Sequence, residues 1–126
     1  MKIIRFEDIE AWQEARKLVK MVYGIINKKP EFRKDFRLVN QIRDAAASSM
    51  SNIAEGFARR SNKEFIQFLF ISKSSAAEVQ SRLYVALDQE YINQNDFDLI
   101  YNQAEIVSKK DSGFIKYLQS QVKQPK

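Results

Sequence analysis

Apolar residues recur at alternating intervals of three and four along almost the whole chain, and this spacing restricts the fold more than any other feature of the sequence. In the first segment the apolar positions are Trp12, Ala15, Val19, Val22 and Ile26. Such intervals place side chains on one face of an α-helix. The same spacing recurs in three later segments. It predicts four helices, over residues 8–28, 37–59, 62–90 and 94–122.

The segments between these helices carry signals that end one helix and begin the next. Pro30 follows the first apolar stripe and ends that helix, because proline cannot continue it. Asp8 is the predicted N-cap of the first helix, and Ser61 with Glu64 forms a capping box for the third. Asn93 is the predicted N-cap of the fourth. The connections are therefore short.

Short connections favour neighbouring helices that run in opposite directions. The predicted fold is all-α: an antiparallel up-down-up-down four-helix bundle in which residues 1–126 form a single domain. Asp111 falls on the apolar face of the fourth helix. We expect it at an interface or in solvent, because an unpaired charge destabilises a core. The side chains expected to be buried are Trp12, Ile42, Ile53, Phe68, Leu83 and Leu118.

Small residues on the second helix indicate a close contact with another helix. Residues 45–49 are all alanine or serine, on the apolar side of the helix. The alternative explanation is helix propensity, since alanine is the best helix former. Gly56 costs a helix interior up to about 1 kcal/mol relative to alanine. We expect it to allow the close approach of another helix or another chain.

Residue types that many enzymes and metal sites use are missing from the chain. It contains no cysteine and no histidine, which excludes disulfides, thiol nucleophiles, Ser-His triads and nearly all zinc and di-iron sites. It has no glycine-rich phosphate loop and no complete calcium loop. We therefore expect no enzymatic activity, no cofactor and no bound metal. No apolar run approaches a membrane span and no signal-peptide core is present, so we expect no membrane partner and no export.

Positive charge is concentrated in one part of the chain. Residues 1–63 hold 14 Lys+Arg and 8 Asp+Glu, a balance of +6, whereas residues 64–126 hold 7 and 8, a balance of −1. Between positions 16 and 37 eight basic residues stand against two acidic ones. Such a cluster predicts contact with nucleic-acid phosphates, and the alternative is a solvated helix face. The candidates are Arg16, Lys17, Lys20, Lys28, Lys29, Arg33, Lys34 and Arg37.

A second group of polar residues is expected to form a hydrogen-bonded network, either inside the bundle or at a contact between subunits. Asn52, Glu55 and Arg59 follow intervals of three and four, so they share one helix face. Glu78 lies between apolar neighbours and is expected to be partly buried beside a partner. A catalytic or metal-binding carboxylate pair is the alternative, and the absence of histidine argues against it. The full set is Arg43, Asn52, Glu55, Gly56, Arg59 and Glu78.

Three motifs add a family resemblance. The first helix opens with F-x-D-I-x-x-W-Q-x-A at residues 6–15, the second contains N-I-A-E-G at 52–56, and the third contains S-A-A-E at 75–78. With these motifs the chain resembles the 23S rRNA intervening-sequence protein family, also described as four-helix-bundle protein. It is similar to the accessory variability determinant of diversity-generating retroelements. Glu90, where that family usually has glycine, and Lys110-Asp111, in place of apolar residues, depart from the pattern.

The resemblance implies a bacterial, cytoplasmic four-helix bundle that assembles as a ring-shaped homopentamer. It also implies RNA or DNA, or an enzyme that acts on nucleic acid, as a partner. The biochemical role of the family is unsettled, and a shared fold does not transfer a function.

Two functions of different kinds fit these features. In the first, the chain is a non-enzymatic, oligomeric, sequence-independent nucleic-acid-binding accessory whose basic face contacts RNA or DNA phosphates. In the second, it is a structural scaffold or protein–protein interaction module whose basic face never meets nucleic acid. A basic stripe continuous across subunits would separate the two.

Overall fold

Four long helices and two short ones make up a computed structural model of the chain, which describes residues 2–122. In chain order they are η1 (Phe6–Asp8), α1 (Glu10–Asn27), α2 (Pro30–Lys34), α3 (Phe36–Phe57), α4 (Asn62–Asp88) and α5 (Gln94–Val122). The predicted all-α fold is confirmed, and each predicted helix corresponds to one of the four long helices. The short helix α2 has no counterpart in the prediction.

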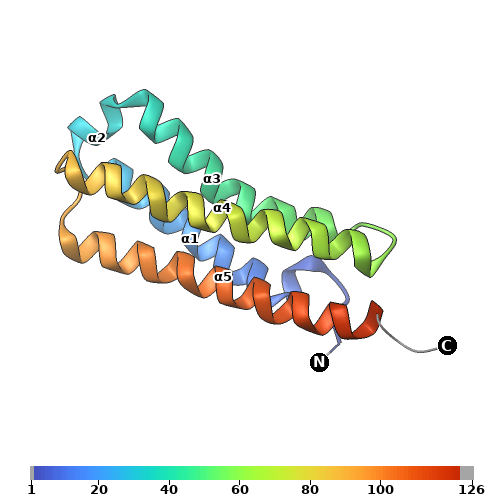
Figure 1. Cartoon of the computed structure of the whole chain (residues 1–126). Helices are drawn as coiled ribbons and strands as arrows, with labels where there is room; N and C mark the ends of the chain where they lie inside the picture. The colour runs from blue at the N-terminus through green and yellow to red at the C-terminus, as the bar shows by residue number, and fades with distance from the viewer. Residues whose placement is uncertain (1, 123–126) are drawn as a thin grey trace.

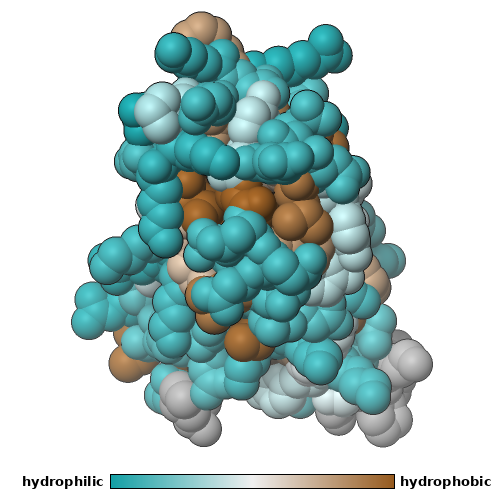
Figure 2. Space-filling model, turned by 90° about the vertical axis from the view of Figure 1, so that its left-hand side faces the viewer, coloured by the Kyte–Doolittle hydropathy of each residue, from teal (hydrophilic) through white to brown (hydrophobic). Residues whose placement is uncertain are grey.

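The four long helices enclose one core. α1 packs against α3 and α5, and α4 packs against the same two helices from the other side. The chain direction alternates from each long helix to the next (Figure 1). α2 lies at one end of the bundle, the end that faces the viewer in Figure 2, and α1 begins at the opposite end.

The beginning of α1 differs from the prediction. The Asp8 carboxylate accepts hydrogen bonds from the backbone N–H groups of Ile4 at 3.0 Å and Arg5 at 3.2 Å. These two bonds lower the pKa of Asp8. α1 begins at Glu10 with Ile9 as its N-cap, so the predicted capping by Asp8 is wrong. The turn before the helix uses this carboxylate instead.

Two other helix starts agree with their sequence signals. Ser61 Oγ accepts a hydrogen bond from the backbone N–H of Glu64 at 3.1 Å. Asn93 Oδ1 accepts one from the backbone N–H of Asp96 at 2.8 Å. Pro30 follows the end of α1 and begins α2, at a position where a missing N–H removes no helical hydrogen bond.

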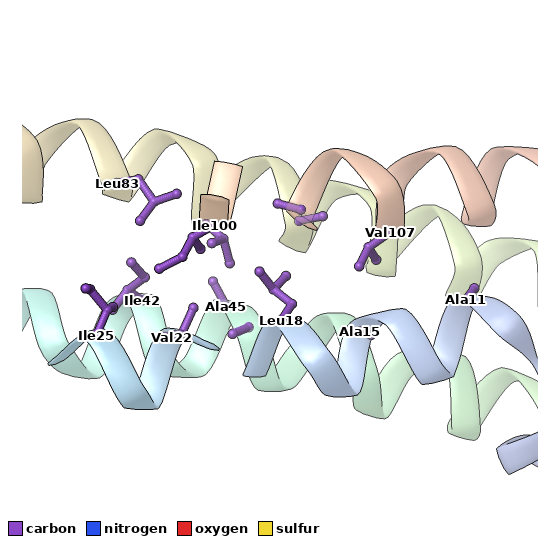
Figure 3. Packing of buried hydrophobic residues seen from close by; sticks show 14 of the residues in the cluster. Ala11, Ala15, Leu18, Val22, Ile25, Ile42, Ala45, Leu83, Ile100 and Val107 are labelled. Carbon is purple, nitrogen blue, oxygen red and sulfur yellow. The ribbon is translucent and has the colours of Figure 1, made fainter. Parts of the chain in front are cut away.

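The core is built from the apolar faces of all four long helices. Figure 3 shows Leu18 and Val22 of α1 facing Ile42 and Ala45 of α3, with Leu83 of α4 and Ile100 of α5 across the core. Five side chains predicted to be buried are indeed in the core: Trp12, Ile42, Ile53, Leu83 and Leu118. Phe68 is only partly buried, because its ring lies at the surface beneath the Arg59 guanidinium, 4.6 Å from its centroid.

α3 and α4 approach each other closely at two places. A Cβ atom at Gly56 would lie 2.7 Å from Phe65 Cδ1 and 2.8 Å from Phe68 Cβ, so the expected close approach is confirmed and the approaching helix is α4. Farther along, Ser72 Oγ lies 2.8 Å from the backbone carbonyl oxygen of Ser49. The run of small residues therefore lies where α4 packs on α3.

Asp111 is fully buried, so the expectation that it lies at an interface or in solvent is wrong. Its Oδ2 lies 2.6 Å from Ser72 Oγ, and its Oδ1 has no hydrogen-bond partner within residues 2–122. Burial raises the pKa of Asp111 to about 7, although the Ser72 hydrogen bond and the Lys73 charge oppose the shift. The adjacent Lys110 is exposed and pairs with Glu10 at 2.8 Å. Only the aspartate of this pair enters the core.

The Ser72 hydroxyl explains how the core accommodates Asp111. Its oxygen is within hydrogen-bond distance of both the Asp111 carboxyl and the Ser49 carbonyl, yet a hydroxyl has one hydrogen to donate. A backbone carbonyl oxygen only accepts. Both contacts are hydrogen bonds at once when Asp111 is protonated, because the carboxyl then donates to Ser72 and Ser72 donates to Ser49. When Asp111 is ionised, Ser72 donates its hydrogen to the carboxylate, and the hydrogen bond from Ser72 to the Ser49 carbonyl oxygen is lost.

Replacing Gly56 by alanine should lower the free energy of unfolding. Overpacking typically costs about 1–3 kcal/mol, which exceeds the gain of up to about 1 kcal/mol in helix propensity. The control is Gly113→Ala in α5, where an added Cβ meets nothing within 4 Å, and which should stabilise the protein. Urea denaturation measures both variants. Equal changes at the two positions would contradict the close approach of α4.

Replacing Asp111 by asparagine should stabilise the protein above about pH 7, with a gain that shrinks as the pH falls. The pKa of Asp111 is about 7 in the folded state and about 3.9 in an unfolded chain. This group therefore stabilises the wild type progressively as the pH falls from about 7 to about 4, by up to about 1.4 kcal/mol per pH unit. Asparagine stays neutral and donates to Ser72 throughout.

Urea denaturation between about pH 5 and about pH 8 measures the free energy of unfolding of the wild type and of the variant. Subtracting one from the other cancels the contribution of the other carboxylates, which both proteins share. A stability difference that does not vary with pH would refute the raised pKa.

Candidate nucleic-acid interface

An aromatic contact holds α2, and with it the basic residues at positions 28–37, at one end of the bundle, which we call the basic end. Phe32 of α2 is fully buried and stacks on Tyr91, with ring centroids 5.1 Å apart. The Tyr91 hydroxyl donates a hydrogen bond to Asp35 Oδ2 at 3.0 Å, which raises the pKa of Tyr91. Asp35 Oδ1 accepts one from the backbone N–H of Leu38 at 3.2 Å. These contacts join α2 and the start of α3 to the connection between α4 and α5.

That connection turns at Glu90, which stands where glycine is usual. Its φ of 62° is the left-handed conformation that glycine adopts without strain. The backbone N–H of Tyr91 donates to the Ala86 carbonyl oxygen at 2.9 Å, so α4 still ends in the usual hydrogen-bonded form. Lys29 Nζ donates to the Glu90 carbonyl oxygen at 2.6 Å. One of the basic residues thus holds this turn.

All eight basic residues predicted to contact nucleic acid are exposed. Besides Lys29, two of them make contacts that hold the basic end together. Lys28 pairs with Asp96 of α5 at 3.7 Å, and Arg33 donates a hydrogen bond to the Asn27 carbonyl oxygen at 2.6 Å. The positive charges of these three residues remain at the surface, but each side chain already makes a contact within the protein.

The remaining basic residues divide into two groups. On α1, Lys17 pairs with Glu14 at 3.3 Å, and the Arg16 guanidinium lies 6.0 Å from the Trp12 ring centroid. The other three basic residues make no hydrogen bond, ion pair or ring contact within residues 2–122. These unpaired cations are Lys20 on α1, Lys34 on α2 and Arg37 on α3.

A groove at this end has a mixed rather than a positive rim. Figure 2 shows hydrophilic side chains around an apolar centre on this face. The groove has a volume of about 520 Å³, and it is lined by Ile25, Lys28, Lys29, Glu90, Tyr91, Ile92, Asn93 and Asp96. Two lysines there stand beside two carboxylates. The positive charge without such neighbours lies instead around Lys34 and Arg37, where α2 meets α3.

The residues predicted to form one polar network make separate contacts within the protomer. Asn52 Nδ2 donates to the carbonyl oxygen of Ser48 at 2.8 Å and to its Oγ at 2.9 Å. Ser75 Oγ of α4 donates to the same Ser48 Oγ at 2.9 Å. Glu55 and Arg59 form an exposed ion pair at 3.0 Å.

The rest of this set lies apart from Asn52. Glu78 is exposed and pairs with Arg82 at 3.4 Å, so its expected partial burial is wrong. The Arg43 guanidinium lies 5.3 Å from the Tyr23 ring centroid, and Gly56 is buried against α4. The described residues of one protomer do not bring these groups together. A contact between subunits stays the prediction for them.

Sequence reasoning missed the residues that position the basic end. Asp35 directly precedes a helix, and an aspartate there is an N-cap signal. Nothing in the sequence signals its partner Tyr91, which is 56 residues away. The ring of Phe36, at the first position of α3, is exposed among basic residues and was also missed. An aromatic residue between Lys34 and Arg37 is the signal that was available.

Two further features of residues 2–122 concern metals and membranes. No three acidic side chains in this part of the chain come together as ligands for a metal ion. None of its helices combines the length and the apolar character that a membrane span requires.

Comparison with known proteins finds a family model and solved structures that are similar to this chain. The family model of the 23S rRNA-intervening sequence protein matches residues 7–113. A solved structure of a protein of unknown function, from the S23 ribosomal protein family of Bacteroides thetaiotaomicron, is similar with a TM-score of 0.70 and 25% sequence identity. The similarity covers 84% of this chain and 94% of that one. No curated protein matches the chain.

Proposed function

The chain belongs to the 23S rRNA-intervening sequence protein family, and from that premise we propose that it is a non-enzymatic, oligomeric accessory protein that binds RNA or DNA. In this proposal the basic end of the bundle contacts phosphates, and the sequence of the bases is not read. The names of the family and of the solved relative refer to 23S rRNA and to a ribosomal protein. Structured RNA is therefore the first nucleic acid to test, and duplex DNA the second.

The observation that carries this proposal is the group of unpaired cations Lys20, Lys34 and Arg37. A cation without an ion-pair partner gives up no internal contact when it binds a phosphate. Each phosphate contact releases counterions, which is the main source of affinity in sequence-independent binding. The described chain is helical and offers no sheet of aromatic residues that would read bases.

Oligomerisation would repeat the basic segment in every subunit and strengthen a weak contact. Several large apolar side chains of α4 are exposed, and a groove of about 450 Å³ runs beside two of them. Its lining is Ile66, Gln67, Phe70, Ile71, Ser74, Ser75 and Glu78. Glu78 also belongs to the set predicted for a subunit contact. This face supports an assembly in which α4 meets a neighbouring subunit.

The second candidate function is a structural scaffold that docks a protein partner. The same exposed side chains of α4 favour it, because an apolar face also fits a protein partner. In that case the basic end keeps the protein in solution and contacts no nucleic acid.

The triple variant Lys20→Glu, Lys34→Glu, Arg37→Glu should weaken nucleic-acid binding and flatten its dependence on salt. The logarithm of the affinity falls linearly with the logarithm of the salt concentration, with a slope of about −0.9 per phosphate contact on duplex DNA. The control is the triple variant Lys63→Glu, Lys109→Glu, Lys116→Glu, which makes the same charge change at exposed positions on α4 and α5. It should retain the wild-type slope.

Fluorescence anisotropy with structured RNA and with duplex DNA measures these slopes. An equal loss of affinity in both variants would mean that binding depends on the net charge of the protein and not on the position of Lys20, Lys34 and Arg37. If the wild-type protein does not bind either nucleic acid at about 50 mM salt, the scaffold function remains.

The protein should behave as an oligomer in solution, and the family resemblance gives five copies of the 14.8 kDa protomer. Phe70→Glu should shift light scattering toward the protomer mass, because a charge would enter the contact on α4. The control Leu99→Glu places the same charge at an exposed apolar position of α5. Circular dichroism checks that both variants stay helical. A wild-type monomer at tens of micromolar would refute the assembly.

A further inference from the structure

Phe36 is exposed without a structural reason. It exposes 73% of its surface and makes no ring contact within residues 2–122. Phe32, four residues earlier, is fully buried against Tyr91, and the next apolar residues of α3 face the core. Phenylalanine is a weaker helix former than alanine or leucine. Neither helix formation nor core packing therefore accounts for an aromatic ring at the first position of α3.

Two basic residues flank Phe36 in the sequence. Lys34 lies two residues before it and Arg37 directly after it, and both are exposed and unpaired. The acid between them, Asp35, has both carboxylate oxygens engaged by internal donors, the Tyr91 hydroxyl and the Leu38 backbone N–H. The two cations that flank the ring in the sequence are thus free, while the acid between them is engaged by the fold.

The corner between α2 and α3 is fixed before any ligand arrives. Phe32 anchors α2 in the core, and Arg33 holds the Asn27 carbonyl oxygen at the end of α1. Asp35 caps α3 and contacts the α4–α5 connection through Tyr91. The backbone that carries the ring and the two cations is therefore already ordered, and it loses little conformational freedom on binding.

We infer that Phe36 is a stacking site for an unpaired base of single-stranded RNA or DNA, with Lys34 and Arg37 contacting the adjoining phosphates. This rests on the proposed function and narrows its ligand from nucleic acid in general to strands with unpaired bases. Every base has a flat face, so stacking on a phenyl ring requires no particular sequence. In a duplex these faces are covered by neighbouring base pairs, and Phe36 has no such face to meet.

The test compares a labelled uridine homopolymer of about 20 nucleotides with a duplex of equal length. Phe36→Ala should weaken binding of the single strand by roughly 5- to 100-fold, as expected for the loss of one stacked base. It should leave duplex affinity and both salt slopes unchanged, because the phosphate contacts remain. Phe36→Tyr should retain wild-type binding. The control Tyr117→Ala removes another exposed aromatic ring, 57% exposed on α5, and should change neither affinity.

A direct signal of stacking comes from Phe36→Trp. The single strand should quench the added indole fluorescence, and the duplex should not. If Phe36→Ala leaves single-strand binding unchanged while the triple charge reversal abolishes it, stacking is overturned and the proposed function stands. If the wild-type protein binds neither the single strand nor the duplex, both the stacking site and the proposed function are refuted. A Phe36→Ala variant with an altered oligomeric mass would identify the ring as a subunit contact and would also overturn stacking.

Discussion

The close packing of α3 on α4 is the contact on which the rest of this bundle depends. At Gly56 the two helices leave no space for a single methyl group, and farther along a serine side chain spans the gap to the facing backbone. Ser72 then reaches on to Asp111 of α5, so one chain of polar groups connects three helices inside the core. A helix that shifted along its axis would leave these groups unpaired, which is costly in a low-dielectric interior. The polar chain therefore fixes the register of the helices that the apolar residues only bring together.

The opposite end of the bundle is organised by Asp35. Its two oxygens cap α3 and hold Tyr91, and Tyr91 stacks on the buried ring of Phe32. As a result, the basic residues near α2 are of two kinds. Lys29 and Arg33 hold backbone carbonyl oxygens and stabilise this end, whereas the unpaired cations add charge without a structural contact. Replacing Lys29 or Arg33 would change both stability and surface charge. Replacing an unpaired cation changes the surface charge alone, so its effect on binding can be interpreted directly.

Two of the predictions that were wrong, those for Glu78 and Asp8, share a physical cause. Glu78 was expected to be partly buried because Ala77 and Val79 flank it, yet Ala77 is exposed and only Val79 faces the core. Alanine occurs on either face of a helix, so it is a weak guide to burial. Asp8 was expected to cap α1, but its carboxylate accepts hydrogen bonds from two N–H groups of the preceding turn instead. In both cases the local sequence pattern is compatible with more than one environment for the side chain, and it does not decide between them.

The sequence by itself determined what depends on neighbours along the chain. The spacing of apolar residues defined four helices and their buried faces, the capping residues Ser61 and Asn93 marked two helix starts, and the cluster of basic residues identified one charged segment. Only the tertiary structure decided that Asp111 enters the core, that Tyr91 holds Asp35, and that Lys34 and Arg37 stay unpaired. The reason is that desolvation and hydrogen bonding depend on groups from other helices, and distances along the sequence do not specify which of these groups meet in space.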